Sequence, residues 1–299
     1  MRPILALVIY LVFVFAGGAL LAPGLWWLTQ AGAQDFPNIA GAPFHRFVDR
    51  SLLILALGGL WPLLGALGAT SRREIGIIPP YGQSKKLFGG LLLGFLSLAI
   101  VAGTAIGFGD RLLAQNLTAH KIVGTILGAM ITAALVATLE EILFRGGIFG
   151  GLRRMLYWPI ALVVSSLVYA LVHFLQRTEL VGAVTWHSGF DLLPQMLRGF
   201  ADLHALVPGF FSLTLAGILL GLAYQRTGNL YFSIGLHAGW IFWLKTYGTF
   251  TTDAPGARTW FWGGSKMIDG WLAFFVLAVT LAILKFLLRQ KRSPFQIPP

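Results

Sequence analysis

The sequence places two adjacent carboxylates and an arginine inside a long apolar segment. Glu140, Glu141 and Arg145 interrupt the segment Ile122–Leu152. An ionisable group at the centre of a membrane span costs about 2.5–3.5 kcal/mol on insertion scales, so such a group is by default a candidate functional site. Glu141 and Arg145 are spaced i,i+4 and are expected to form an ion pair within one helix. Glu140 is turned about 100° away from Glu141 and can therefore face other helices.

Two histidines interrupt later apolar segments in a similar way. If the chain turns at residues 154–159, Glu140 lies 14 residues before this turn and His173 lies 14 residues after it. At about 1.5 Å per residue, both side chains are roughly 21 Å from the turn. His237 follows Arg226 by 11 residues, which places it roughly 16 Å deep on the same assumption. One acid and two imidazoles are thus expected in one layer, where the acid would act as a general base toward water.

The composition is that of an integral membrane protein. Of 299 residues, 57% are hydrophobic and only 11% are charged, whereas soluble domains contain about 25% charged residues. The net charge of +11 lies in short clusters between apolar spans and forms no basic face with aromatic residues. It therefore indicates anionic lipid headgroups as partners, and not nucleic acid. The absence of cysteine excludes disulfides, a thiolate nucleophile and a Cys-ligated metal.

The expected fold is all-α, a polytopic membrane bundle of about eight transmembrane helices. Crossing a bilayer takes about 20 predominantly apolar residues. The stretch Leu230–Tyr247 is short and polar, which suits a helix packed inside the bundle. The expected spans are Ile4–Ala22, Ser51–Ala69, Leu87–Phe108, Ile122–Leu152, Pro159–Leu175, Leu206–Tyr224, Leu230–Tyr247 and Gly270–Leu288.

Three parts are expected along the chain. Residues 1–121 would hold the first three helices, residues 122–247 a core of the next four, and residues 248–299 a loop, the last helix and a basic tail. A small excess of Lys and Arg on one side of the spans favours both termini in the cytoplasm. The expected location is a bacterial cytoplasmic membrane.

The longest connection, Gln176–Ala205, predicts a short interfacial amphipathic helix. Phe190, Leu193, Leu197 and Phe200 recur in it at helical spacing, with charged residues between them. This pattern is typical of a helix that lies in the membrane interface. Such a helix would either seal the bundle or act as a gate for the substrate.

Three short motifs lie in order on separate apolar segments. Glu140, Glu141 and Arg145 form EExxxR, an aromatic residue precedes His173 by four positions, and His237 begins the third motif. These motifs resemble EExxxR, FxxxH and HxxxN or HxxxD of the CPBP family, which includes type II CAAX prenyl endopeptidases, bacteriocin-processing proteins and Abi-type membrane proteins. The resemblance covers about residues 122 to 241.

The chain departs from the family pattern at two positions. Tyr169 stands where the second motif has phenylalanine. Ile241 stands where the third motif has asparagine or aspartate, four residues after His237. Isoleucine cannot form a hydrogen bond, so activity would be weak or absent unless another group substitutes. Ser233, one turn before His237 on the same face, is the candidate substitute.

The resemblance implies an intramembrane endopeptidase with assigned residue roles. Glu140 would activate a water held with His173, and His237 would stabilise the tetrahedral oxyanion. Glu141 and Arg145 would support the site. The implied partners are membrane lipid and a membrane-associated peptide or protein substrate, and whether this substrate is prenylated stays open.

Alternatives remain for the cofactor and for the function. Glu140, His173 and His237 would also make a His₂Glu metal set with an open position for water, and the cofactor would then be a divalent metal such as zinc. A metal-free glutamate mechanism is the other possibility. The protein could also be a catalytically weak or inactive CPBP-fold binding or immunity protein. A transporter or proton relay is the third class, because intramembrane Glu and His also serve that role.

Overall fold

The computed structural model describes residues 3–68, 71–176 and 178–289. Contacts between residues divide the chain into two units. The first comprises Met1–Thr70 and Val172–Asp202, and the second comprises Ser71–Leu171 and Leu203–Pro299. Most of the basic tail expected at the C-terminus, residues 290–299, lies outside the described residues.

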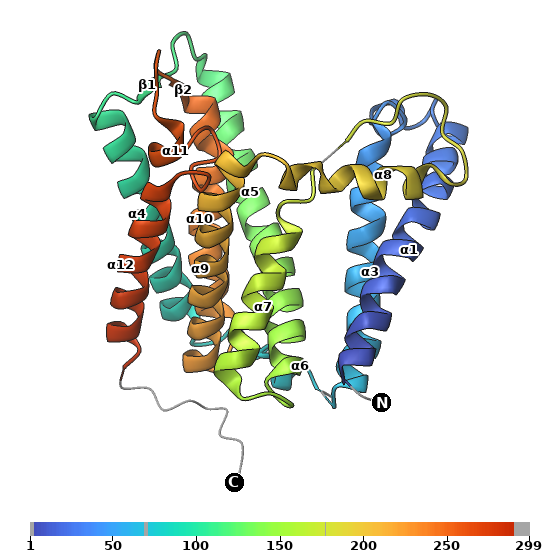
Figure 1. Ribbon diagram of the computed structural model, residues 1–299, viewed down its shortest axis with the longest axis horizontal. Coiled ribbons are helices and arrows are strands. Elements are labelled where there is room, and N and C mark those ends of the chain that lie inside the picture. The colour runs from blue at the N-terminus through green and yellow to red at the C-terminus, as the bar shows by residue number, and fades with distance from the viewer. Residues whose placement is uncertain (1–2, 69–70, 177, 290–299) are drawn as a thin grey trace. The chain divides into compact units, whose positions relative to one another are not determined.

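The first unit is built on a pair of long helices. Helix α1 (Pro3–Ala31) packs along α3 (Phe44–Ala66), and the short α2 (Pro37–Ala40) lies between them in sequence. Helix α8 (Ser188–Met196) runs crosswise to α1 and α3 and continues into the 3-10 turn η3 (Leu197–Phe200) (Figure 1).

Helix α8 confirms the expected short amphipathic helix and shows how it is attached. Leu192 and Met196 are buried against α1 and α3, and a Cβ at Gly189 would lie 2.0 Å from a carbonyl oxygen of α1. Phe190 and Leu197, which belong to the apolar face expected from the sequence, are exposed. An interfacial helix keeps such a face toward lipid. The helix therefore has two apolar faces, and the expected pattern includes residues of both, because Leu193 packs against the buried cluster.

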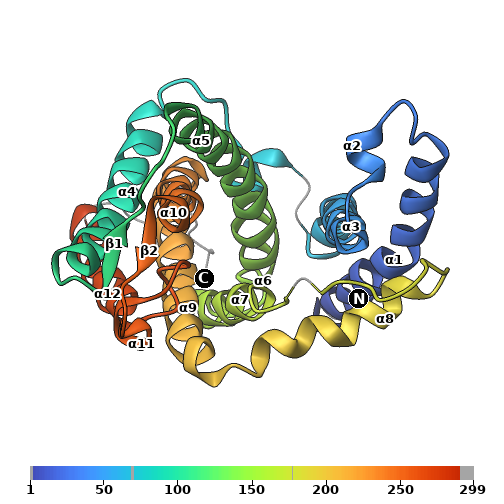
Figure 2. The same cartoon turned by 90° about the horizontal axis from the view of Figure 1, so that it is seen from above.

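The second unit is a bundle in which α10 lies between α4, α5 and α9 (Figure 2). Its helices are α4 (Ser84–Gly107), α5 (Ala119–Glu141), α7 (Trp158–Val172), α9 (Leu203–Thr227), α10 (Tyr231–Phe250) and α12 (Trp271–Leu287). A π-helix, η2 (Ile142–Phe149), and the single turn α6 (Gly150–Leu152) continue α5. The smaller elements are the 3-10 turn η1 (Arg72–Ile75), the strands β1 (Arg111–Leu113) and β2 (Thr251–Asp253), and α11 (Thr259–Trp262).

Each of the expected spans contains a helix, and the protein is an integral membrane protein of all-α fold. The helices α7 and α12 are apolar but have only 15 and 17 residues. Exposed apolar side chains on α5, such as Leu127, Ile131 and Leu135, form a surface suited to lipid. Among the residues that the structure describes, five helical stretches are long and apolar enough to cross a bilayer: Leu5–Ala31, Phe44–Ala66, Ser84–Gly107, Ala119–Leu152 and Leu203–Thr227.

Glycines set the distance between α4 and α10. A Cβ at Gly90 or Gly94 would lie 2.1 Å from a carbonyl oxygen of α10, and a Cβ at Gly235 would lie 2.0 Å from a carbonyl oxygen of α4. Each helix thus carries a GxxxG pair, completed on α10 by Gly239, and such pairs let membrane helices approach closely. His237 lies between the two glycines of α10, so this packing also fixes the position of the histidine.

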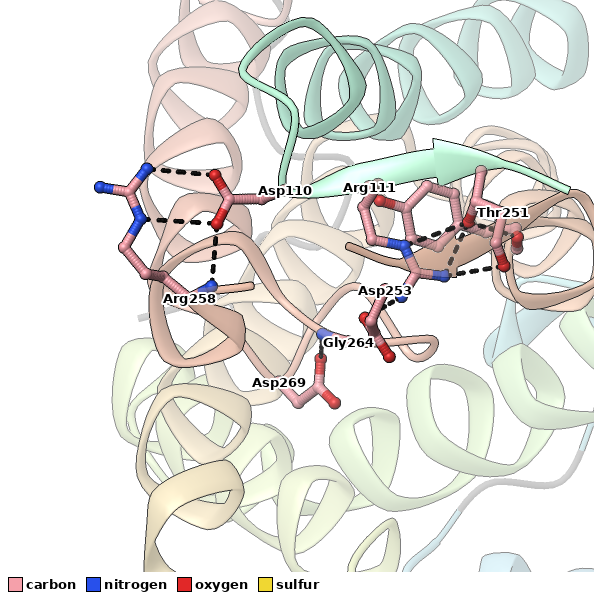
Figure 3. A network of polar contacts seen from close by, with 8 residues as sticks. Asp110, Arg111, Thr251, Asp253, Arg258, Gly264 and Asp269 are labelled. Carbon is pink, nitrogen blue, oxygen red and sulfur yellow. Dashed lines mark hydrogen bonds and ion pairs between the residues drawn. The ribbon is translucent and has the colours of Figure 1, made fainter. Parts of the chain in front are cut away.

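A polar network joins the chain segments that follow α4 and α10 (Figure 3). Arg111 on β1 is buried, pairs with Asp253, and donates from Nη2 to Oγ1 (2.7 Å) and the carbonyl oxygen (3.0 Å) of Thr251. The preceding Asp110 accepts from the backbone N–H of Arg258 at 2.8 Å and pairs with its guanidinium at 3.1 Å. These hydrogen bonds from Arg258 lower the pKa of the Asp110 carboxyl. The network holds β1 and β2 in antiparallel register and so ties α4 to α10 a second time.

Gly94→Ala is expected to destabilise the second unit, because the new methyl group would overlap a backbone carbonyl that cannot move alone. Overpacking of this kind costs about 1–3 kcal/mol. The measurement is the midpoint of thermal unfolding of the purified protein in detergent.

The matched control is Gly103→Ala on the same helix, where a Cβ would meet open space. Its midpoint should stay the same or rise slightly, because alanine favours the helix. Equal midpoints for the two variants would contradict the proposed role of the glycine contact.

Candidate functional site

A carboxylate, a guanidinium and an imidazole meet in the second unit at the end of α5. Glu141 is fully buried, and Arg145 on η2 is 2% exposed. Oε1 of Glu141 lies 3.1 Å from Nη1 of Arg145 and 2.9 Å from Nδ1 of His237 on α10. The ion pair expected from the i,i+4 spacing is therefore present. The hydrogen bond from His237 to the same oxygen was not expected.

Glu140 is the more accessible of the two carboxylates. Its side chain is 26% exposed, and its Oε2 lies 3.8 Å from Nε2 of His237. One imidazole thus has a different glutamate near each of its nitrogens. Glu140 and His237, which were expected in one layer from their depth along the helices, therefore lie close together.

Tyr169 on α7 completes the surroundings of His237. Its hydroxyl lies 3.3 Å from Nε2 of the imidazole. Its ring packs edge-on against Phe144 with centroids 5.0 Å apart, and the guanidinium carbon of Arg145 lies 4.4 Å from its centroid. Sequence reasoning noted Tyr169 only as a departure from a motif. The departure was the signal in the sequence, because tyrosine has a hydroxyl that the phenylalanine of the motif lacks.

The helix carrying the two glutamates changes its geometry directly after them. The expected span was one continuous helix to Leu152, but residues 142–149 form the π-helix η2. π-Helical segments are rare in proteins, and those that occur are often found at functional sites. Gly146 in this segment packs on η1, where a Cβ would lie 2.9 Å from the carbonyl oxygen of Ile75. This close backbone contact places Arg145 beside Glu141 and Tyr169. No pattern in the sequence predicts it.

The turn after this helix lies where it was expected, and the arginine just before it is buried. Arg153 donates to Oε1 of Gln225 at 3.0 Å and to the hydroxyl of Tyr224 at 3.2 Å. Arg154 is exposed and pairs with Glu74 at 2.6 Å. The amide and phenol of α9 supply buried partners that the span pattern did not reveal.

His173 lies directly after the end of α7 and is exposed. It was expected inside the span Pro159–Leu175, but the helix ends at Val172. The contacts of the chain assign His173 to the first unit, whereas Glu140 and His237 belong to the second. Its role as the partner of Glu140 therefore stays a prediction.

Ser233 and Ile241 lie one turn before and one turn after His237 on α10, and neither supplies a hydrogen-bond donor to the site. The hydroxyl of Ser233 donates to the carbonyl oxygen of Leu230 at 3.0 Å. The expectation that Ser233 substitutes for the missing amide is therefore wrong, because its hydroxyl hydrogen is used within its own helix. Ile241 is buried among apolar side chains of α5 such as Ala133 and Ala137.

An apolar cavity of about 740 Å³ lies between α4, α5 and α10. It is lined by Thr138, three residues before Glu141, and by Ala238, next to His237. Most of its remaining lining is aliphatic or aromatic, as in Leu91 of α4. A cavity of this size and character suits the apolar part of a small ligand or chain.

The metal set considered from the sequence, Glu140, His173 and His237, combines residues of both units. Within residues 3–68, 71–176 and 178–289, no three His, Cys, Asp or Glu side chains are grouped so that they could hold an ion. In His237, Nδ1 faces Glu141 and Nε2 faces Tyr169. Zinc or another divalent metal thus stays a prediction, and the chemistry proposed below contains no step through a metal.

The fold and the site together define a polytopic α-helical membrane protein with a buried glutamate–arginine–histidine cluster. Residues 122–243 match the model of a family described as Rce1-like, type II CAAX prenyl endopeptidase Rce1-like. This segment runs from α5 into α10 and contains all five site residues expected from the motifs. The family resemblance found from the motifs is therefore confirmed over this segment, which matches a family of CAAX-type membrane proteases. A search of curated proteins found no match.

Arg145→Met is expected to destabilise the protein, because it leaves the fully buried carboxylate of Glu141 without its cation. Removing one partner of a buried ion pair costs about 3–5 kcal/mol. The measurement is the free energy of unfolding in detergent. Lys121→Met, at an exposed position in the first turn of α5, is the matched control and should change little. A loss no larger than that of the control would show that the pair does not stabilise the bundle.

Proposed function

We propose that the protein is an intramembrane endopeptidase that hydrolyses a peptide bond in a membrane-associated protein or peptide. The observation that carries the proposal is the pairing of the accessible Glu140 with His237, whose other nitrogen is held by Glu141. Peptide hydrolysis needs a base that activates water and a donor at the developing oxyanion. An acid next to an imidazole that is itself oriented by a second acid can provide both.

In the proposed reaction, Glu140 takes a proton from water while the water oxygen attacks the peptide carbonyl carbon. This proton is shared with Nε2 of His237, and the N–H formed there donates to the oxyanion. The buried Glu141 carboxylate stabilises the resulting imidazolium, in the way that the carboxylate does in catalytic triads. The proton then passes to the leaving nitrogen as the C–N bond breaks, and the products are an amine and a carboxylic acid that ionises.

His173 is proposed to hold the attacking water together with Glu140. The matched family segment includes His173, and this supports the role.

The proposed substrate carries an apolar group near the bond that is cleaved. The cavity beside Thr138 and Ala238 is almost entirely apolar, and the matched family is described as a CAAX prenyl endopeptidase. A prenylated cysteine near a C-terminal C-a-a-X sequence would present such a group. A prenylated peptide is therefore the first substrate to test.

The proposed location is a bacterial cytoplasmic membrane with both termini in the cytoplasm. Exposed basic residues in two connections support this orientation, namely Arg72 and Arg73 between α3 and α4 with Lys85 at the start of α4, and Arg154 between α6 and α7. Positive charge in short loops favours the cytoplasmic side.

Glu140→Gln is expected to lower cleavage by about 10²–10⁴-fold, because an amide cannot accept the proton of the attacking water. His237→Gln and His173→Gln should lower it by a similar factor. The measurement uses purified protein in detergent and a fluorogenic peptide with a farnesylated C-a-a-X end, compared with the same peptide without the farnesyl group.

Glu179→Gln, which changes an exposed glutamate, is the control and should cleave at the wild-type rate. Wild-type rates in both Glu140→Gln and His173→Gln would overturn the mechanism, and a wild-type protein inactive on both peptides would favour a non-catalytic role. Adding 1,10-phenanthroline separates the cofactor alternatives, because only a zinc-dependent enzyme should lose activity.

The orientation can be tested directly, because the chain has no cysteine. Single cysteines at exposed positions are introduced as Ser71→Cys and Gln115→Cys. A membrane-impermeant maleimide added to intact cells should label Gln115→Cys but not Ser71→Cys, which should react only after the cells are permeabilised. The reverse pattern would show that the protein has the opposite orientation.

A further inference from the structure

In the contact between Tyr169 and His237, the charges around the imidazole determine which group donates the hydrogen bond and which accepts it. Nδ1 of His237 lies 2.9 Å from Oε1 of Glu141, which also lies 3.1 Å from Nη1 of Arg145. A carboxylate paired with arginine is ionised and can only accept hydrogen bonds. The proton of the neutral imidazole is therefore on Nδ1.

When the imidazole is neutral, Nε2 therefore accepts and the hydroxyl of Tyr169 donates. A neutral imidazole has one N–H and one acceptor nitrogen, and the phenol oxygen lies 3.3 Å from Nε2. The Tyr169 side chain is itself fixed, because it is 3% exposed and is packed between Phe144 and Arg145. A rigid donor of this kind selects one tautomer and one ring orientation of the histidine.

Helix α10, which carries His237, supplies no such donor at position 233 or position 241. A side chain four residues away on the same helix can reach the imidazole, but position 241 is isoleucine and packs against α5. The hydroxyl of Ser233 is used by the carbonyl of Leu230. The donor found at the imidazole comes from α7 instead.

We propose that Tyr169 is a positioning residue that takes the place of a hydrogen-bonding side chain at position 241. Its hydroxyl holds His237 in the Nδ1–H tautomer, with Nε2 turned toward Glu140. During hydrolysis Nε2 exchanges the hydrogen bond from Tyr169 for the proton shared with Glu140, so this inference rests on the proposed function. The contact itself exists whether or not the protein is an enzyme, and it can be measured separately.

The first test is spectroscopic and needs no substrate. The protein is labelled with ¹⁵N-histidine, and the signals of His237 are assigned by their loss in His237→Gln. In the wild-type protein the neutral form should be the Nδ1–H tautomer. In Tyr169→Phe the forms with a proton on Nε2 should increase, because Glu140 is then the polar group that faces this nitrogen.

The second test compares kinetics on the farnesylated peptide. Tyr169→Phe should lower kcat about tenfold, the effect of one hydrogen bond of about 1.4 kcal/mol, and should leave KM nearly unchanged. Tyr157→Phe, which removes the hydroxyl of an exposed tyrosine just before α7, is the control and should change neither kcat nor the spectrum. The double variant Tyr169→Phe/Ile241→Asn should regain most of the lost kcat, because asparagine can reach the imidazole from position 241.

The outcomes separate this inference from the proposed function. A dominant Nε2–H tautomer in the wild-type protein, or an unchanged His237 spectrum in Tyr169→Phe, would overturn the role of Tyr169 even if cleavage is observed. A wild-type protein that cleaves no peptide but shows the expected tautomer change would overturn the endopeptidase proposal and leave the positioning contact established. Lack of rescue by Ile241→Asn would show that the two positions are not interchangeable.

Discussion

A single buried oxygen atom, Oε1 of Glu141, constrains the arrangement of the second unit. Taking a carboxylate out of water costs several kcal/mol unless partners surround it, and here the partners are Arg145 at 3.1 Å and His237 at 2.9 Å. Arg145 belongs to η2 and His237 to α10, so neither element can shift without unpairing a buried charge. The same constraint gives the imidazole a defined orientation, which is the property that general acid–base chemistry needs.

Backbone packing makes this arrangement possible. The GxxxG pairs bring α4 and α10 so close that no Cβ fits at their contact, and His237 lies between Gly235 and Gly239. The π-helix η2 begins directly after Glu141 and packs on η1 through Gly146. Small residues thus hold both the helix that carries the acids and the helix that carries the histidine. The polar groups are placed by rigid elements and not by loops, as a reactive site requires.

The site and the family comparison support each other at different levels. The matched segment, residues 122–243, contains every site residue and indicates the class of chemistry. The coordinates add which groups meet, namely Glu140, Glu141, Arg145 and Tyr169 around one imidazole within the second unit. They also show that Ile241 on α10 packs against α5, while a phenol hydroxyl from α7 lies at the imidazole. A departure that suggests an inactive site in the sequence is therefore accompanied by a donor at the same histidine.

The sequence by itself determined the all-α membrane class, the approximate positions of the helices and the ion pair between Glu141 and Arg145. These features depend on local composition and on i,i+4 spacing, which the chain carries in a single segment. Only the tertiary structure decided which nitrogen of His237 meets Glu141, that Tyr169 reaches the other nitrogen, and that Arg153 is buried. The physical reason is that such contacts depend on the distance and rotation between helices far apart in sequence. Those two quantities are set by backbone contacts at glycines, and no local pattern reports them.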